Sequence, residues 1–240
     1  MVLFQQKDMS LIRTSAGLDV FDRRHIEVLA EACVFQYDVA LAKVRSWHAA
    51  GVDLEDIYLD GLVSAARLMG EWWLSDRLDF VKVTIGTHSL QQILYEFSPQ
   101  FLQRASQKTN GYRAVFFLTP WSQHSFGSMM VAEFFRREGW KVSSVAPESE
   151  ADVVKELSRQ WIALVGFSVC SDRGMPALAA LIQKARQVSL NPNVQIMIGG
   201  PMVDQNPDLA MALGADLIGG DAVASQRIAR QYLKTLELAA

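Results

Sequence analysis

His124 is the residue of this sequence best placed to bind a metal. It lies in the segment ThrProTrpSerGlnHisSerPheGly, 119–127, directly after a short apolar run at 114–118. Neutral imidazole is a good ligand for a first-row transition metal. Gly127 follows three residues later, and a residue without a Cβ lets a helix begin close beside a bulky planar group. The segment therefore predicts a ligand with a bulky planar group, bound at the end of a strand.

Two more groups of small residues follow apolar runs further along the chain. Ser168 ends one run, and Cys170 lies two residues later. Gly199 and Gly200 end another run. A hydroxyl beside two residues without side chains makes a slot for something long and partly polar. If these runs are parallel strands of one sheet, the three groups meet at its carboxyl edge, where such folds bind ligands.

The second half of the chain has the alternating pattern that this arrangement needs. Strictly alternating strands and helices predict a parallel sheet with helices on both faces. Five strands favour the flavodoxin-like (Rossmann-like) order. We expect strands at 114–118, 141–145, 162–168, 194–199 and 216–218, and helices ending at Gly139, at 148–159, at 176–188, near Leu209 and at 222–236.

The first half of the chain has a helical period instead. Apolar residues recur every three or four positions from Ile26 to Trp47, which predicts one helix that begins after Asp22 and ends at Gly51. Two more helices are expected, one after Asp53 and one from Leu78 to Arg104. We therefore expect three parts: an unassigned segment at 1–18, a helical bundle cap at 19–106, and an α/β domain at 111–240, after the polar linker 107–111.

Composition excludes several classes of protein. The net charge of −3 lacks the basic footprint of an autonomous nucleic-acid binder, so no direct sequence-specific DNA binding is expected. No signal peptide or membrane-spanning stretch is visible, and two free cysteines without a CxxC pair suit the cytoplasm. No convergent acid–base pair or Ser-His-Asp arrangement can be assigned, which indicates a protein that is not an enzyme. The pair Arg136-Arg137 is a candidate for partner binding.

The three groups resemble the motifs of cobalamin-binding domains. That family carries Asp-x-His-x-x-Gly after strand one, Ser-x-Leu or Ser-x-Thr after strand three, and Gly-Gly after strand four. The resemblance implies that His124 is the lower axial ligand of cobalt, and that the nucleotide tail lies between Ser168 and Gly199-Gly200. Two positions depart from the pattern. Ser122 replaces the charged Asp that orients the histidine, so heme becomes a competing cofactor, and Cys170 adds a thiol as a redox handle.

The helical part resembles the cap that precedes cobalamin domains. Trp72 and Trp73 are adjacent and point about 100° apart on a helix, so one of them is expected to cover the upper face of the cofactor. His88 lies one helical turn beyond Thr84 and is a further candidate for the upper face.

The segments 79–86 and 122–140 together resemble the AerR/PpaA family of photosynthetic bacteria. The resemblance implies an antirepressor that binds a PpsR/CrtJ-type repressor of photosynthesis genes and senses light or redox state. The implied cofactor is cobalamin, in the adenosyl or hydroxo form, with heme as the alternative. A corrinoid methyl carrier of a methyltransferase system is the second reading, because such carriers share the fold and the Val-Thr of the cap.

Overall fold

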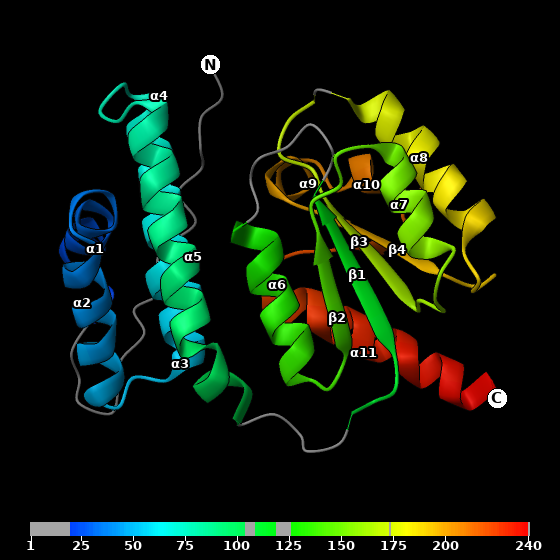
Figure 1. Ribbon diagram of the computed structural model, residues 1–240, viewed down its shortest axis with the longest axis horizontal. Coiled ribbons are helices and arrows are strands. Elements are labelled where there is room, and N and C mark those ends of the chain that lie inside the picture. Colours follow the sequence, from blue (N-terminus) through cyan, green and yellow to red (C-terminus); the bar gives the residue numbers. More distant parts are fainter. Residues whose placement is uncertain (1–19, 104–108, 119–125, 173, 240) are drawn as a thin grey trace. The chain divides into compact units, whose positions relative to one another are not determined.

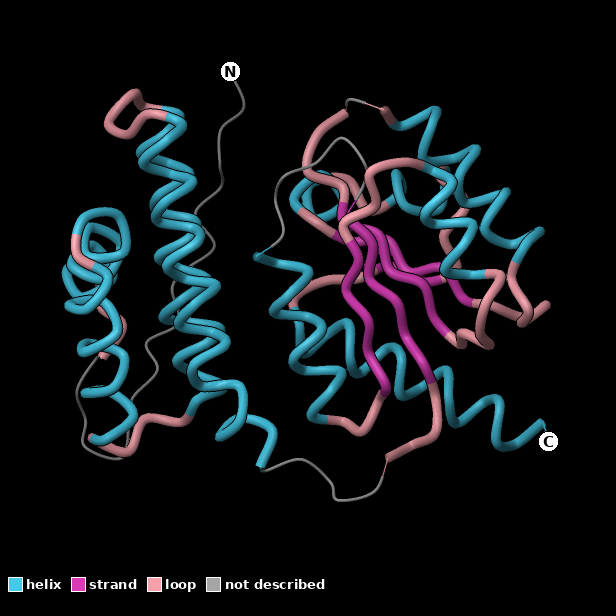
Figure 2. The backbone as a smooth tube through the Cα atoms, in the orientation of Figure 1, coloured by secondary structure: helices cyan, strands magenta, loops and turns pink. Residues whose placement is uncertain are grey.

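The protein was analysed as a computed structural model, which describes residues 20–103, 109–118, 126–172 and 174–239. The chain forms two compact units, Met1–Phe97 and Ser98–Ala240. The described residues of the first unit are helical, whereas the second holds a parallel sheet with its helices, so the predicted fold class is confirmed (Figure 2). The boundary between the units lies between Phe97 and Ser98, inside the helix Phe80–Gln103. This is earlier than the predicted end of the cap at 106.

The helical unit packs its elements around an apolar core. Asp22 caps the first helix by accepting a hydrogen bond of 2.7 Å from the N–H of His25, as the sequence predicted. Tyr58 is fully buried in the core, and its hydroxyl donates to the carbonyl of Leu94 at 3.0 Å. The elements are α1 (Arg23–Phe35), α2 (Tyr37–Ala49), α3 (Leu54–Asp56), the π-helix η1 (Ile57–Leu62), α4 (Val63–Leu74) and most of α5 (Phe80–Gln103).

The single helix predicted up to Gly51 is two helices in the structure. α1 ends at Phe35 and α2 begins at Tyr37, because Gln36 has φ −151° and ψ 73°, outside the helical region. The N–H of Gln36 still donates to the carbonyl of Ala32 at 2.8 Å, so α1 keeps its final hydrogen bond. The predicted end is correct, since Gly51 has φ 88° just beyond α2. The prediction of one continuous helix was therefore wrong.

The second predicted helix continues without a break but changes its winding. α3, η1 and α4 follow one another directly, and the residues of η1 are wound as a π-helix. A Cβ on Gly61, within η1, would lie 3.2 Å from the ring of Phe21 and 3.3 Å from the ring of Trp47. The glycine therefore allows the backbone of η1 to lie against these two rings.

The α/β unit contains a parallel sheet in the order β2-β1-β3-β4-β5. This is the flavodoxin-like order predicted from the sequence. In the register of the sheet, Leu118 pairs with Ser168, and Ser168 pairs with Gly199. The carboxyl ends of three neighbouring strands therefore lie side by side. The strands are β1 (Arg113–Leu118), β2 (Lys141–Val145), β3 (Leu164–Ser168), β4 (Gln195–Gly199) and β5 (Leu217–Ile218).

Helices cover both faces of this sheet (Figure 1). Side chains of β1 alternate between the two cores: Val115 and Phe117 pack with residues of α7 and α8, whereas Ala114 and Phe116 pack with α6 and α11. No described helix is long and apolar enough to cross a bilayer. The helices are α6 (Phe126–Arg137), α7 (Glu150–Leu157), α8 (Met175–Val188), α9 (Pro201–Gln205), α10 (Asp208–Ala212) and α11 (Ala222–Ala239).

Candidate cofactor-binding edge of the sheet

The ends of β3 and β4 are joined beyond the last pair of strand residues. The N–H of Val169 donates to the carbonyl of Gly199 at 2.8 Å, and the N–H of Met202 donates to the carbonyl of Val169 at 3.3 Å. The structure therefore brings Ser168 together with Gly199 and Gly200. Parallel α/β sheets bind their ligands at this edge.

Gly200 has a conformation and an environment that exclude a side chain. Its φ of 106° is one that residues with a Cβ rarely adopt. A Cβ there would lie 2.7 Å from the carbonyl oxygen of Val169 and 2.9 Å from the hydroxyl oxygen of Ser168. The sequence assigned this glycine to an open slot, but its missing side chain lets two segments of backbone approach each other. A ligand at this point meets backbone and the Ser168 hydroxyl.

Gly219 belongs to the same edge and was not singled out from the sequence. Its N–H donates to the carbonyl of Ile198 at 2.8 Å, and a Cβ on Gly199 would lie 3.1 Å from its carbonyl oxygen. The end of β5 thus approaches the end of β4 through two glycines. The sequence did contain a signal for Gly219 as a site residue. The segment LeuIleGlyGlyAsp, 217–221, repeats after strand five the Gly-Gly pattern found at strand four.

Gly127 lies in the first turn of α6 and is exposed. No described atom lies within 4 Å of the position that a Cβ would take, and its φ is outside the left-handed region. Packing among the described residues therefore gives no reason for a glycine here. The space beside the start of α6 fits the predicted approach of a bulky planar group.

His124 and Ser122 lie outside the described residues. Their segment starts directly after β1 ends at Leu118 and stops directly before α6 begins at Phe126. Both ends of the segment are thus attached to the unit that holds the sheet. No group of three or more His, Cys, Asp or Glu side chains that could hold a metal ion occurs within the part of the chain that is described.

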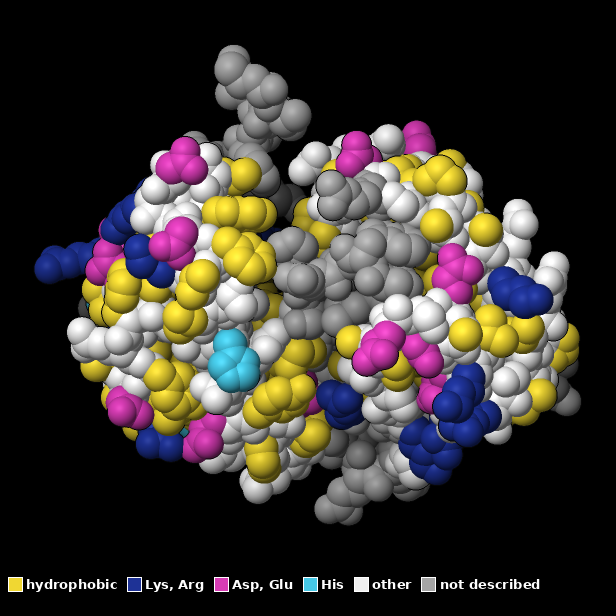
Figure 3. All heavy atoms as spheres, turned by 45° about the horizontal axis from the view of Figure 1, so that its top comes forward, with side chains coloured by type: hydrophobic (Ala, Val, Ile, Leu, Met, Phe, Trp, Pro, Cys, Tyr) yellow, Lys and Arg dark blue, Asp and Glu magenta, His cyan; other side chains and the backbone are white. Residues whose placement is uncertain are grey.

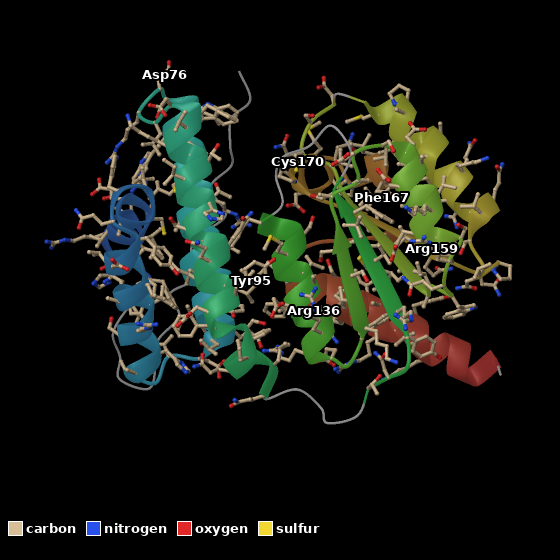
Figure 4. The ribbon with its side chains drawn as sticks, viewed as in Figure 1. Asp76, Tyr95, Arg136, Arg159, Phe167 and Cys170 are labelled. Atoms are coloured by element: carbon tan, nitrogen blue, oxygen red, sulfur yellow. The ribbon has the colours of Figure 1, made fainter. Side chains whose placement is uncertain are left out.

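Cys170 lies close to Ser168, at the end of β3. Its sulfur is 3.7 Å from the hydroxyl oxygen of Ser168, and its side chain is half-buried. Figure 4 shows Cys170 just past the end of the strand that carries Phe167. The thiol therefore belongs to the same cluster as the predicted serine and glycines.

The two adjacent tryptophans have different surroundings. Trp72 is buried in the helical unit, and the guanidinium of Arg77 lies 4.0 Å from the centre of its ring. Trp73 is 43% exposed. Of the two indoles, Trp73 is therefore the one that is accessible to a ligand, whereas Trp72 has the surroundings of a core residue. Contact of either residue with a cofactor stays a prediction.

His88 is exposed on α5, near a row of exposed apolar side chains. Val81 and Ile85 lie on the same face of the helix and are 63% and 47% exposed. The hydroxyl of Thr84 donates to the carbonyl of Phe80 at 2.8 Å, within the helix itself. Figure 3 shows apolar side chains gathered on the surface of the helical unit. The role of His88 at the upper face of a cofactor stays a prediction.

Comparison with known families finds a match in the second half of the chain. Residues 119–228 match the family model of the B12 binding domain. The match begins directly after β1, ends within α11, and includes every residue of the edge described above. Residues 119–228 are therefore similar to the B12 binding domain, in agreement with the resemblance found in the sequence.

Two individual proteins make the comparison more specific. A protein of Rhodobacter capsulatus, described as "Uncharacterized 20.5 kDa protein in bchF-crtJ intergenic region", is 27% identical over 175 residues, which are 73% of this chain and 91% of that protein. This relative and the B12 binding domain agree with the resemblance to the AerR/PpaA family. The monomethylamine corrinoid protein of Methanosarcina barkeri has a similar fold, with a TM-score of 0.72 at 18% identity over 85% of this chain and 96% of its own.

The described edge fits a bound cobalamin. No described atom lies within 4 Å of the position that a Cβ on Gly127 would take, and the Ser168 hydroxyl lies beside backbone that carries no side chain at Gly199 and Gly200. Hydroxyl and backbone groups can hydrogen-bond a polar tail without adding charge. The residues are thus suited to a large and partly polar group.

Proposed function

We propose that this protein is a cobalamin-dependent antirepressor that responds to light or redox state and binds a PpsR/CrtJ-type repressor of photosynthesis genes. The observation that carries the proposal is the Rhodobacter relative, whose description places it in the bchF-crtJ intergenic region. In this proposal the part of the chain that matches the B12 binding domain binds the cofactor that senses light or redox state. In this proposal the protein is a regulator and not an enzyme.

Each residue at the edge has a role in this proposal. His124 would hold the cobalt of cobalamin, and Ser122 would orient the imidazole ring by hydrogen bonding without adding a charge. Ser168, Gly199 and Gly200 hold the polar tail. When bound, cobalamin would supply a light-sensitive bond between cobalt and an adenosyl or hydroxo group. Heme competes for the same histidine, because the charged orienting residue is absent.

The helical unit supplies the readout in this proposal. Trp73, Val81 and Ile85 are exposed apolar side chains, and such surface is typical of a binding site. In this proposal a change at the cofactor alters the arrangement of the protein and with it the surface that a partner meets. A repressor that binds only one arrangement then reports the state of the cofactor.

The direct test is the absorption spectrum of the purified protein after addition of hydroxocobalamin, adenosylcobalamin or hemin. We expect a cobalamin spectrum with histidine bound, lost in His124→Ala and kept in His25→Ala, a control in the helical unit. A pull-down with a PpsR/CrtJ-type repressor, in the dark and in light, tests the partner. An unchanged spectrum in His124→Ala contradicts the axial ligand, and equal binding in dark and light contradicts the antirepressor.

A corrinoid methyl carrier is the second candidate. It is favoured by the similar fold of the Methanosarcina corrinoid protein. Ser122 argues against a methyl carrier, because it stands where the family has an Asp. A carrier whose cobalt cycles between oxidation states benefits from a carboxylate that orients the histidine. Methyl transfer from the loaded protein to a thiol or tetrahydrofolate acceptor, without light-dependent repressor binding, makes the carrier the better assignment.

A further inference from the structure

The chain passes from one unit to the other inside a helix. α5 is helical from Phe80 to Gln103, yet the boundary between the units falls between Phe97 and Ser98. The residues that flank the predicted linker 107–111 on both sides belong to the α/β unit. The crossing therefore lies within α5 and not in the linker. Pro99 lies directly beside it.

The residues just before the crossing are attached to the helical unit. Glu96 accepts a hydrogen bond of 2.6 Å from Arg45 of α2, as part of an ion pair. Phe97 is 4% exposed, and its ring packs edge-on against His48 with the ring centres 5.9 Å apart. This part of α5 therefore moves with α2.

The residues just after the crossing are attached to α6. The hydroxyl of Ser98 donates to a carboxylate oxygen of Glu133 at 2.5 Å. Glu133 is 2% exposed, and its other carboxylate oxygen lies 2.6 Å from the guanidinium of Arg136. A buried carboxylate needs such partners, and removing one of them is costly. The last turn of α5 is thus attached to α6 by a part-buried polar contact.

Aromatic packing strengthens the same attachment. The ring centres of Phe101 and Phe134 are 5.0 Å apart, and both side chains are almost fully buried. The guanidinium of Arg137 lies 4.3 Å from the ring centre of Phe101 and 4.9 Å from that of Phe134. Arg137 and Arg136, which the sequence offered for partner binding, are therefore both engaged at this attachment. Figure 4 shows Arg136 on α6.

Pro99 weakens the helix at the point where it changes from one attachment to the other. Proline has no N–H, so the carbonyl of Tyr95 receives no hydrogen bond from residue 99, and the ring crowds that carbonyl. Helices bend most readily at such positions. The weakest point of α5 thus coincides with the boundary between two firmly attached ends.

We propose that Pro99 is the pivot about which the helical unit turns, while Ser98–Gln103 stays docked on α6. α6 begins two residues after His124, so the helix that holds the docked turn starts beside the candidate ligand. This inference goes beyond the proposed function and does not depend on it, since the pivot exists with or without a cofactor.

The test compares the full-length protein with Pro99→Ala, both free of cobalamin. The alanine restores one backbone hydrogen bond across the crossing. We expect the amides of Gln100 and Phe101 to exchange with solvent roughly fivefold more slowly, the effect of one added hydrogen bond. Small-angle X-ray scattering should show a narrower range of arrangements of the two units. Unchanged exchange, or an unchanged scattering curve, overturns the pivot.

Two further variants separate a pivot from a general effect of proline. Pro176 lies in the first turn of α8, where no N–H is needed, so Pro176→Ala should change neither measurement. Glu133→Gln should speed amide exchange in the docked turn of α5 while exchange near Glu96 stays unchanged. Faster exchange on both sides of Pro99, or on neither, contradicts separate attachments. None of these outcomes depends on cobalamin, so failure of the proposed function is a distinguishable result.

Discussion

The two edges of the parallel sheet hold their loops in different ways. At the amino edge, side chains fasten the loops: the buried Asn191 donates to the carbonyl of Ile162 at 2.9 Å. Asp216 accepts from the N–H of Ile196 at 2.8 Å and pairs with Arg186 at 2.8 Å. At the carboxyl edge, the ends of β3, β4 and β5 approach through glycines and backbone hydrogen bonds.

The amino edge of the sheet is thus built for folding stability, whereas the carboxyl edge is the one suited to ligand binding. Polar side chains that satisfy buried backbone groups contribute directly to the free energy of unfolding. The carboxyl edge has glycines and a small hydroxyl instead, and this edge is where an α/β sheet binds its ligands. Substitutions at the amino edge should therefore change stability alone, whereas those at the carboxyl edge should also change cofactor binding.

Gly200→Ala should have the largest effect on stability. The positive φ and the crowding by Val169 and Ser168 together should lower the free energy of unfolding by about 3 kcal/mol. Urea denaturation measures this. Gly111→Ala is the matched control, because Gly111 has φ 79° but no described atom within 4 Å of its Cβ position. An equal loss in both variants would mean that crowding at the carboxyl edge contributes nothing.

Asn191→Ala should cost about 2 kcal/mol, because it leaves the carbonyl of Ile162 without its buried donor. The same denaturation experiment measures the loss. Asn193→Ala, two residues away and exposed, should cost less than about 0.5 kcal/mol. Cobalamin affinity of the folded variant should equal that of the wild type. A weakened affinity would show that the two edges are coupled. It would contradict the statement that the amino edge affects stability alone.

Gly127→Ala should act in the opposite sense on stability and on binding. In the absence of a ligand it should stabilise α6 by about 0.5 kcal/mol, because alanine favours helix over glycine. Cobalamin titration followed by absorbance should show weaker binding, since the added methyl group occupies the open space beside the first turn of α6. Unchanged affinity in this variant removes the steric argument for a glycine at this position.

The two cysteines offer the smallest and most local test. Burial raises the pKa of the Cys33 thiol to about 12, so this thiol stays protonated and unreactive at pH 8. Cys170 is half-buried at the carboxyl edge. A thiol reagent should therefore modify Cys170 in the native protein, and Cys33 only after unfolding. Bound cobalamin should slow the reaction of Cys170, and an unaltered rate would place the cofactor elsewhere.

The sequence predicted the sheet better than the helices. Short apolar runs between turn residues located all five strands, and their alternation with helices predicted the order β2-β1-β3-β4-β5. The break between α1 and α2 at Gln36 could not be predicted from the sequence. The apolar period continues across this single residue, although its backbone leaves the helical conformation. The short helix α9 was also missed, since five residues after a Gly-Gly pair carry too little periodicity.

The candidate site was predictable in its residues but not in its packing. Ser168, Gly199 and Gly200 were found from their positions at strand ends, because parallel strands bring those ends together. The crowding at Gly200 and the inclusion of Gly219 depend on how β5 approaches β4. Such distances arise from tertiary packing, which local patterns do not encode.

The position of the crossing within α5 also determines which pieces of this protein can be separated. A fragment cut at the polar segment, from Gly111 onward, loses Phe101 and Ser98. The ring of Phe134 would then lose its contact with Phe101, and the carboxylate of Glu133 would lose its hydrogen bond from Ser98. A fragment that begins at Ser98 retains both. For recombination, proteolysis or domain grafting, the boundary to use is therefore a point within a helix, although a polar stretch of sequence follows only a few residues later.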